Sequence, residues 1–543
     1  MGRHDRSGGG GICGGPANSA TAGVTSATPR ESSRRGIGVG ARSQATNDKP
    51  RAPGADIATS PAGTIDGNPA RSRAAALAPT RPMTRYVVFV AMLLSIAMLR
   101  RRGLEAAFLR VWIPCFLALP FAFWVNIPGL PDPNFMQAAI LPILVVLLLE
   151  RGARMRFGSM EALIALYVVV RVVADFTSRG YSDAQNYLFY MLSALVGPYL
   201  LGRYVIDSRR MDVATAKAFV GMFLIFFPMF VYETRAWVSP IFKLLSPLFP
   251  DAGSGLSIRW GIARTAGTFE HPILACIMIV AVYRLHRWLC WSGEWQRPQA
   301  GAWAWLQRHS RRLPWPLQQQ ITIVLIVMAL MTISRGPWIG AFAGAAVAMV
   351  GNFERRGRAL VVVLSLMAVG ALAGKLALDA YITPEEGELL SGEAQTMLYR
   401  KVMIEQYQDF LMSRPWNGWG LTTVPKIQGM ESVDNAFFLM ALQHGVIAVA
   451  VFVTIFVVAI VSQIRFGLRA PAGEPPLGFT FSGIYLMCFV AFATVYMGAQ
   501  TEPMLFLLLG WGESVKNRAA EVGTGQATAV PAAPASPFRR VLR

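Results

Sequence analysis

Apolar residues in this chain come in long runs and do not alternate with polar positions. Each run needs only a few flanking residues to reach the roughly 20 that cross the hydrocarbon core of a bilayer. This pattern predicts an all-α polytopic membrane bundle, with helices near 86–100, 106–126, 134–149, 160–177, 184–206, 214–234, 270–289, 319–334, 337–353, 359–379, 436–464 and 479–499. A short apolar run at 503–513 would raise the number of spans from twelve to thirteen.

The composition agrees with a membrane protein. The 543 residues are 54% hydrophobic and only 15% charged. Soluble domains carry roughly 25% charged residues, so this composition excludes an ordinary soluble enzyme.

The net charge of +20 follows the predicted topology. Basic residues cluster in short loops that alternate with loops poor in basic residues, which is the positive-inside pattern. By this rule residues 207–212 and 291–318 face the cytoplasm, whereas 235–265 and 380–434 face outward. We therefore expect a multi-pass protein of the bacterial inner (cytoplasmic) membrane that contacts membrane lipids. No recognition motif accompanies the charge, so we expect no nucleic-acid partner.

The two ends of the chain differ from the apolar part. Residues 1–82 are rich in Gly, Ala, Ser, Pro and Thr. This composition cannot bury a core, so it predicts a disordered tail. An alternative is that the protein starts at Met83. Residues 516–543 predict a second, basic and disordered tail, on the cytoplasmic side if the run at 503–513 is a span. The transmembrane bundle is then expected at 83–515, with a large periplasmic loop at 380–434.

The sequence carries no sign of a bound cofactor. The five cysteines are scattered without a CxxC pair or histidines at ligand spacing, and no phosphate-binding glycine motif is present. We expect neither a metal nor a cofactor. The candidate chemistry therefore rests on polar residues near the membrane, where an ionisable side chain usually faces a wet cavity or the bundle interior.

The first such group is 264–272, Arg-Thr-Ala-Gly-Thr-Phe-Glu-His-Pro, which leads from an outer loop into a span. Pro272 fits the first turn of a helix, and the free N–H groups of such a terminus suit an anion. Arg264 adds a fixed positive charge. The alternative is an interfacial arginine that reaches toward lipid headgroups.

The second group is 332–338, Thr-Ile-Ser-Arg-Gly-Pro-Trp, at a break between two spans on the predicted outer side. A guanidinium at such a break can bind a diphosphate through two parallel hydrogen bonds, which makes Arg335 a candidate ligand. Trp338 suits the membrane interface. The alternative is an ordinary loop arginine, although its outer position runs against the positive-inside bias.

The third group lies in the outer segment. Tyr399, Met403, Tyr407 and Phe410 recur at helical spacing and predict an amphipathic helix that also carries Arg400. A Gly/Trp-rich turn with Trp419 follows. Packing explains the aromatic stripe better than a platform for sugar rings does.

The fourth group, Asp434 and Asn435, opens the next span. Asp434 is either a helix N-cap or a carboxylate that accepts a proton from an attacking hydroxyl. His271 and His444 are alternative proton carriers. We interpret His444, which lies well inside the span, as a buried and hydrogen-bonded core residue.

The order of these motifs resembles the O-antigen ligase and polymerase superfamily, as does the long outer loop between two late helices. The motifs that carry the resemblance are Arg-x-x-Gly-Thr-Phe-x-x-Pro at 264–272, Ser-Arg-Gly-x-Trp at 334–338, Tyr-Arg at 399–400, Gly-Trp-Gly at 418–420 and Asn-x9-Gly at 435–445. The resemblance covers residues 264–460, and the earlier helices only by topology.

The resemblance implies a metal-independent, inverting glycosyl transfer at the periplasmic face, from a polyprenyl-diphosphate-linked glycan donor to a glycan or lipid acceptor. Arg264 and Arg335 would bind the diphosphate and stabilise it as it leaves, Arg400 would be a further anion contact, and Asp434 would serve as base. Asn435, His271, Trp338 and Trp419 are expected to contact substrate.

One position departs from the family pattern. O-antigen ligases typically carry His before the conserved Asn, where this chain has Asp434. This departure favours a polymerase of an exported polysaccharide, working with partners of an export pathway, over a ligase acting on lipid A core. A non-enzymatic lipid-glycan transporter is a third reading, which the gathering of the distinctive residues at one face disfavours.

Overall fold

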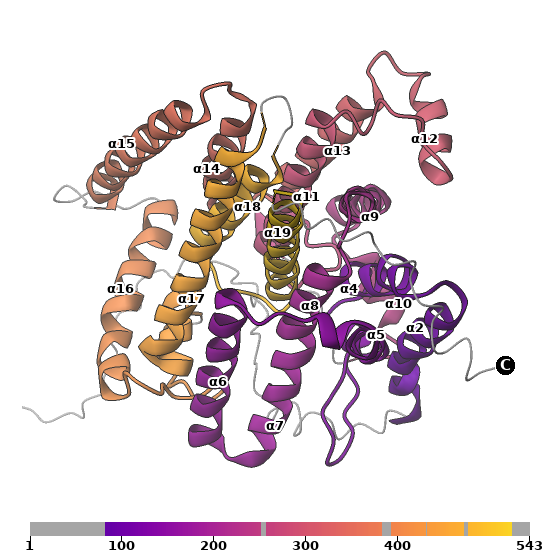
Figure 1. Cartoon of the computed structure of the whole chain (residues 1–543). Helices are drawn as coiled ribbons and strands as arrows, with labels where there is room; N and C mark the ends of the chain where they lie inside the picture. The colour runs from indigo at the N-terminus through magenta and orange to yellow at the C-terminus, as the bar shows by residue number, and fades with distance from the viewer. Residues whose placement is uncertain (1–81, 251–256, 383–391, 431, 472–475, 524–543) are drawn as a thin grey trace, which may run out of the picture. The chain divides into compact units, whose positions relative to one another are not determined.

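The computed structural model describes residues 82–250, 257–382, 392–430, 432–471 and 476–523 (Figure 1). Helices account for nearly all of the regular structure in these ranges, which confirms the all-α prediction. The predicted tails at 1–82 and 516–543 lie largely outside the described residues.

The elements follow one another along the chain as a succession of helices with a single described β-hairpin. The α-helices are α2 (Phe89–Arg102), α3 (Leu104–Ala107), α4 (Ile113–Ala118), α5 (Phe135–Arg151), α6 (Ser159–Arg179), α7 (Tyr181–Tyr190), α8 (Gly197–Tyr204), α9 (Arg209–Ala236), α10 (Pro240–Leu245), α11 (Pro272–Trp291), α12 (Ala302–Ser310), α13 (Leu317–Met331), α14 (Arg335–Met349), α15 (Arg356–Ile382), α16 (Gly392–Ser413), α17 (Ala436–Arg469), α18 (Leu477–Phe492) and α19 (Thr501–Gly523). The hairpin pairs β1 (Ser257–Arg259) with β2 (Ile262–Arg264) in antiparallel register.

Each predicted span has a helical counterpart, but three boundaries differ. The span predicted at 106–126 ends at Ala118, where α4 stops. The span predicted at 479–499 ends at Phe492, where α18 stops. The short run at 503–513 belongs to the 23-residue helix α19, which continues beyond Lys516 into the segment that we predicted as a tail. Buried leucines and small residues along α19 explain why it remains helical inside the bundle.

Four described helices are both long and apolar enough to cross a bilayer, namely α9, α11, α15 and α17. Other predicted spans are shorter or less apolar helices, or are built from several pieces. Two of them contain a π-helical turn, at Phe108–Trp112 and at Met191–Val196. A proline follows two residues after each turn, at Pro114 and Pro198, and its missing N–H explains the local change in hydrogen bonding. The chain is a multi-pass membrane protein, and the number of spans stays a prediction.

Glycines allow two helix pairs to pack closely. On α14, a Cβ atom at Gly344 would lie 2.2 Å from the backbone oxygen of Gly483 on α18. On α8, a Cβ atom at Gly202 would lie 2.1 Å from the backbone oxygen of Leu507 on α19. Small residues bring helix backbones together in membranes, so these contacts fix α14 and α19 against their neighbours.

Candidate functional site

Arg264 ties the β-hairpin to the break between α13 and α14. It is the last residue of β2, and its side chain is buried. Its Nε donates to the backbone oxygen of Thr332 at 3.1 Å, and its Nη2 donates to Ser334 Oγ at 3.0 Å. The two motifs at 264–272 and 332–338, predicted independently, therefore lie together in the folded chain.

Two further arginines lie at the same break. Arg259 on β1 donates from Nη1 to the backbone oxygen of Ile333 at 3.3 Å. The guanidinium carbon of Arg335, the first residue of α14, lies 5.0 Å from the ring centroid of Trp260 in the hairpin turn. We call Arg259, Arg264 and Arg335 the arginine cluster. Arg259 could not be predicted from the sequence, because it lies outside every motif and only the hairpin brings it to the break between α13 and α14.

The surroundings of Arg264 favour an anion. Within the part of the chain that the structure describes, its hydrogen-bond partners are hydroxyl and carbonyl oxygens, and no carboxylate pairs with it. Burial, together with the charge of Arg259, lowers the pKa of Arg264 to about 10. The group is still charged at neutral pH, so a bound anion would compensate a charge that burial makes unfavourable.

Glu233 on α9 supports the loop that follows Arg264. Its carboxylate accepts from the backbone N–H groups of Ala266 at 3.0 Å and Gly267 at 2.8 Å. Ser239 reaches the same loop by donating to the backbone oxygen of Gly267 at 2.9 Å. Neither residue belongs to a sequence motif, and both fix the course of the loop toward His271.

Asp434 and Arg400 form the second part of the site. Arg400 projects from α16, and its Nη2 lies 3.8 Å from Asp434 Oδ2. Ser432 Oγ donates to Asp434 Oδ1 at 2.8 Å. Both charged side chains are partly exposed, at 28% and 31%, so the carboxylate remains accessible to a substrate.

Asn435, and not Asp434, caps α17. The Asn435 side chain accepts from the backbone N–H of Phe438 at 3.0 Å, which is the N-cap hydrogen bond. The alternative reading of Asp434 as a helix cap is therefore wrong, and its carboxylate is left to Arg400, Ser432 and any ligand.

A short segment after α18 connects these groups. A Cβ atom at Gly336 would lie 2.6 Å from Thr494 Oγ1, and the backbone oxygen of Val495 accepts from the N–H of Ala436 at 3.0 Å. The ring of Tyr496 lies 6.4 Å from that of His271. Residues 494–496 thus touch the starts of α14 and α17 and the His271 that precedes α11, and we call them the junction segment. It escaped sequence analysis because that region reads as the end of an apolar span.

His271 caps α11 and is neutral. Its Nδ1 accepts from the backbone N–H of Ile273 at 3.2 Å. Burial, together with the charges of Arg264 and Arg259, lowers its pKa to about 4. The neutral imidazole therefore persists until the pH falls to about 4, and His271 does not exchange protons near neutrality.

We expect the His271→Asn variant to keep the pH profile of the wild-type activity between pH 5 and 9. Asparagine preserves the helix cap, and the wild-type imidazole does not titrate in this range. The measurement is the rate of glycan transfer at intervals of pH in membranes containing each protein. The disappearance of an inflection near neutral pH would show that His271 does carry protons.

The Gly/Trp turn docks into a break in α17. Gly445 has a φ of 81° inside that helix, and the backbone oxygens of Leu442 and Gln443 just before it accept hydrogen bonds from N–H groups of the turn. The backbone N–H of Trp419 donates to the backbone oxygen of Leu442 at 2.8 Å. The indole Nε1 of the same residue donates to the backbone oxygen of Phe410 at 3.0 Å. Trp419 therefore holds the outer segment in place, and substrate contact by its ring stays a prediction.

The backbone conformation at this break gives a stability prediction for Gly445→Ala. A Cβ atom there would lie 1.9 Å from the backbone oxygen of Trp416, and a backbone with φ 81° and ψ 169°, which essentially only glycine adopts, costs an L-residue about 1–3 kcal/mol. We therefore expect the Gly445→Ala variant to melt at a lower temperature than wild type in detergent. The measurement is the fraction of protein that remains monodisperse in size-exclusion chromatography after heating to a series of temperatures. Gly374→Ala on α15, where a Cβ meets nothing within 4 Å, should melt like wild type. Equal melting of both variants would contradict the docking.

The remaining predicted residues take packing positions. Met403 and Tyr407 of α16 are buried against Leu442, with Phe410 beside them, as expected for a packing stripe. Trp338 is half-buried against the main core. His444 is fully buried and stacks on Tyr187 with ring centroids 5.4 Å apart. Among the described residues neither of its ring nitrogens has a hydrogen-bond partner, so the expectation of a hydrogen-bonded histidine is wrong.

Comparison with known proteins gives a family for part of the chain. The profile of the O-antigen ligase family matches residues 320–453. No curated protein matches the chain. The matched region contains Arg335, Arg400, Asp434 and Asn435, and supports a function of the general ligase or polymerase kind with a lipid-linked glycan as substrate. Residues 320–453 are therefore similar to the O-antigen ligase family.

Proposed function

We propose that this protein transfers glycan from a polyprenyl-diphosphate carrier to an acceptor hydroxyl at the periplasmic face of the inner membrane. The observation that carries the proposal is the arginine cluster, which two separate motifs and a hairpin bring to one helix break. A diphosphate carries several negative charges and suits guanidinium groups that bind through paired hydrogen bonds. The partly exposed carboxylate of Asp434 completes the set of groups that such a transfer needs.

The proposed reaction is a single displacement. The acceptor oxygen attacks the anomeric carbon while the bond from that carbon to the diphosphate oxygen breaks, so the configuration inverts. Arg264 and Arg335 stabilise the negative charge that develops on the leaving diphosphate. Asp434 accepts the proton of the acceptor hydroxyl. Fixed guanidinium groups supply the charge stabilisation, so the proposal needs no metal.

A polymerase is favoured over a ligase. Ligases of this superfamily typically carry His at the position of Asp434, and the carboxylate here suits the related reaction of joining lipid-linked repeat units. Transport without chemistry is disfavoured by the charges inside the bundle. Arg171 pairs with Glu502 at 2.6 Å, and both side chains are buried. Arg203 pairs with Glu161 at 3.1 Å. Each of these charges is compensated by its partner, so the pairs offer no uncompensated charge to a glycan that would cross the bundle.

Deletion of the gene in its own host tests the proposal. Single repeat units should accumulate on the polyprenyl carrier, as measured by mass spectrometry of extracted lipid-linked glycans. Finished long chains on the carrier would instead identify a ligase. An unchanged pool of carrier-linked glycan at the outer face would contradict both forms of the proposal.

A further inference from the structure

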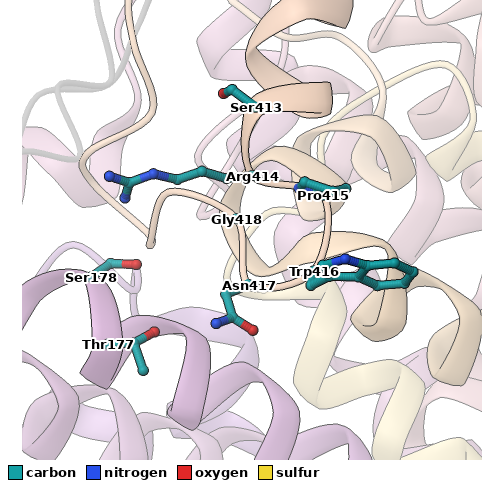
Figure 2. Close-up of a pocket in the computed structure, with 8 residues that line it drawn as sticks. All are labelled: Thr177, Ser178, Ser413, Arg414, Pro415, Trp416, Asn417 and Gly418. Atoms are coloured by element: carbon teal, nitrogen blue, oxygen red, sulfur yellow. The ribbon is translucent and has the colours of Figure 1, made fainter.

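A cavity with several polar lining residues lies beside the Gly/Trp turn, and none of the arginine cluster lines it. Its volume is about 440 Å³, within the roughly 300–1,000 Å³ of small-molecule sites. Figure 2 shows that Thr177 and Ser178, from the end of α6, lie across from Arg414 and Asn417. The complete lining is Thr177, Ser178, Ser413, Arg414, Pro415, Trp416, Asn417 and Gly418.

The hydrogen-bonding groups of this cavity match the hydroxyls of a sugar. Thr177 Oγ1 and Ser178 Oγ both donate to the backbone oxygen of Ala174, at 3.0 and 2.8 Å. Their hydroxyl oxygens can therefore still accept hydrogen bonds. On the opposite wall Asn417 has an exposed side-chain amide, and the Arg414 guanidinium is steadied by the ring of Trp419 at 4.3 Å. The cavity thus offers acceptors on one side and donors on the other.

The cavity shares its supporting helices with Asp434. Helix α16 runs from Arg400, which pairs with Asp434, to Ser413 at the cavity. Helix α17 runs from Asn435 to the break at Gly445, where a Cβ would touch Trp416. At 1.5 Å per residue, the stretch of α17 between them is about 15 Å long. A ligand that reaches both places must be an extended chain and not a single sugar.

We infer that this cavity is a subsite for the acceptor glycan, at a distance of several sugar residues from the hydroxyl that reacts at Asp434. The inference rests on the proposed function and deepens it. The acceptor is assigned here because α16 and α17 connect the cavity to Asp434, whereas the arginine cluster belongs to the hairpin and to the break before α14. Thr177 and Asn417 are the residues that determine acceptor affinity.

The test measures binding of an oligosaccharide that has no carrier lipid and no diphosphate. The probe is prepared by partial acid hydrolysis of the host's own surface polysaccharide and labelled at its reducing end. Equilibrium dialysis against the full-length protein in detergent gives its affinity for wild type, Thr177→Val and Asn417→Ala. Thr454→Val is the matched control, because Thr454 is exposed on α17 and makes the same type of hydrogen bond, to the backbone oxygen of Ala450 at 2.7 Å.

We expect each cavity variant to bind the probe about tenfold more weakly, while the control binds like wild type. In transfer assays the KM for the acceptor should rise by a similar factor and the KM for the donor should not change. Equal binding by wild type and both cavity variants, or no binding by wild type, would overturn the subsite. Displacement of the probe by inorganic phosphate alone would also overturn it, because the cavity would then be an anion site.

The outcome is separable from that of the proposed function. Binding of the carrier-free probe requires no diphosphate and no turnover, so Arg335→Ala should bind it like wild type. Loss of transfer in Arg335→Ala with unchanged probe binding in the cavity variants would refute the subsite alone. Full transfer by Arg335→Ala would refute the diphosphate site, whatever the cavity binds.

Discussion

Replacing Arg335 with alanine should lower the rate of glycan transfer by about 10²–10³-fold, the usual effect of removing one preorganised group that stabilises a developing negative charge. Arg335 begins α14 at the break that Arg264 ties to the hairpin, and its guanidinium lies against Trp260. Its side chain is partly exposed, so the variant should fold and insert normally. The measurement is the elongation of lipid-linked repeat units by membranes that contain equal amounts of each protein.

The controls separate charge from geometry. Arg335→Lys keeps the charge but not the two parallel donors, so its activity should fall between wild type and Arg335→Ala. Arg312→Ala removes an exposed arginine from the predicted cytoplasmic loop and should leave transfer unchanged. All rates are measured in the presence of a chelator, because the proposal needs no metal. Wild-type activity in Arg335→Ala would exclude the arginine as a ligand of the diphosphate.

The sequence predicted the helices well because their cause is local. A run of apolar residues long enough to cross the membrane folds as a helix, since lipid offers no other partner for its backbone. The end of α18 was misjudged for the same reason. Residues 493–499 carry no charge and continue the apolar run, but in the structure they contact Gly336, Ala436 and His271. Such contacts depend on distant residues and leave no local pattern.

The same distinction applies to the site. Arg264, Arg335 and Asp434 were predicted because a charge at the edge of an apolar span is unusual. Arg259 and Glu233 were missed because their contribution depends on the hairpin and on the path of a loop. Trp419 attracted attention as an aromatic residue in a Gly-rich turn, yet its hydrogen bonds hold that turn against α17. Sequence patterns thus identified unusual residues, and the fold showed that Trp419 is one whose hydrogen bonds support the outer segment.

Asp434→Asn should lower transfer by about 10²–10⁴-fold if the carboxylate accepts the proton of the acceptor hydroxyl. Asparagine has the same shape and can still accept from Ser432 Oγ, but it cannot take up a proton. Because Asn435 caps α17, the substitution leaves the helix start intact. Asp409→Asn, at an exposed carboxylate of α16, is the matched control and should retain full activity.

Two further variants decide between a base and a structural partner of Arg400. If Asp434 only orients Arg400 through their 3.8 Å ion pair, Arg400→Ala should lose as much activity as Asp434→Asn, and Asp434→His should be equally inactive. If it is the base, Asp434→His should recover part of the rate, because imidazole also accepts a proton. An unperturbed histidine has a pKa of about 6.5, so the recovered activity should rise with pH through that value, as the neutral form that can act as base becomes populated. A pH-independent, low rate in Asp434→His would therefore assign Asp434 to positioning and leave the proton acceptor to another group.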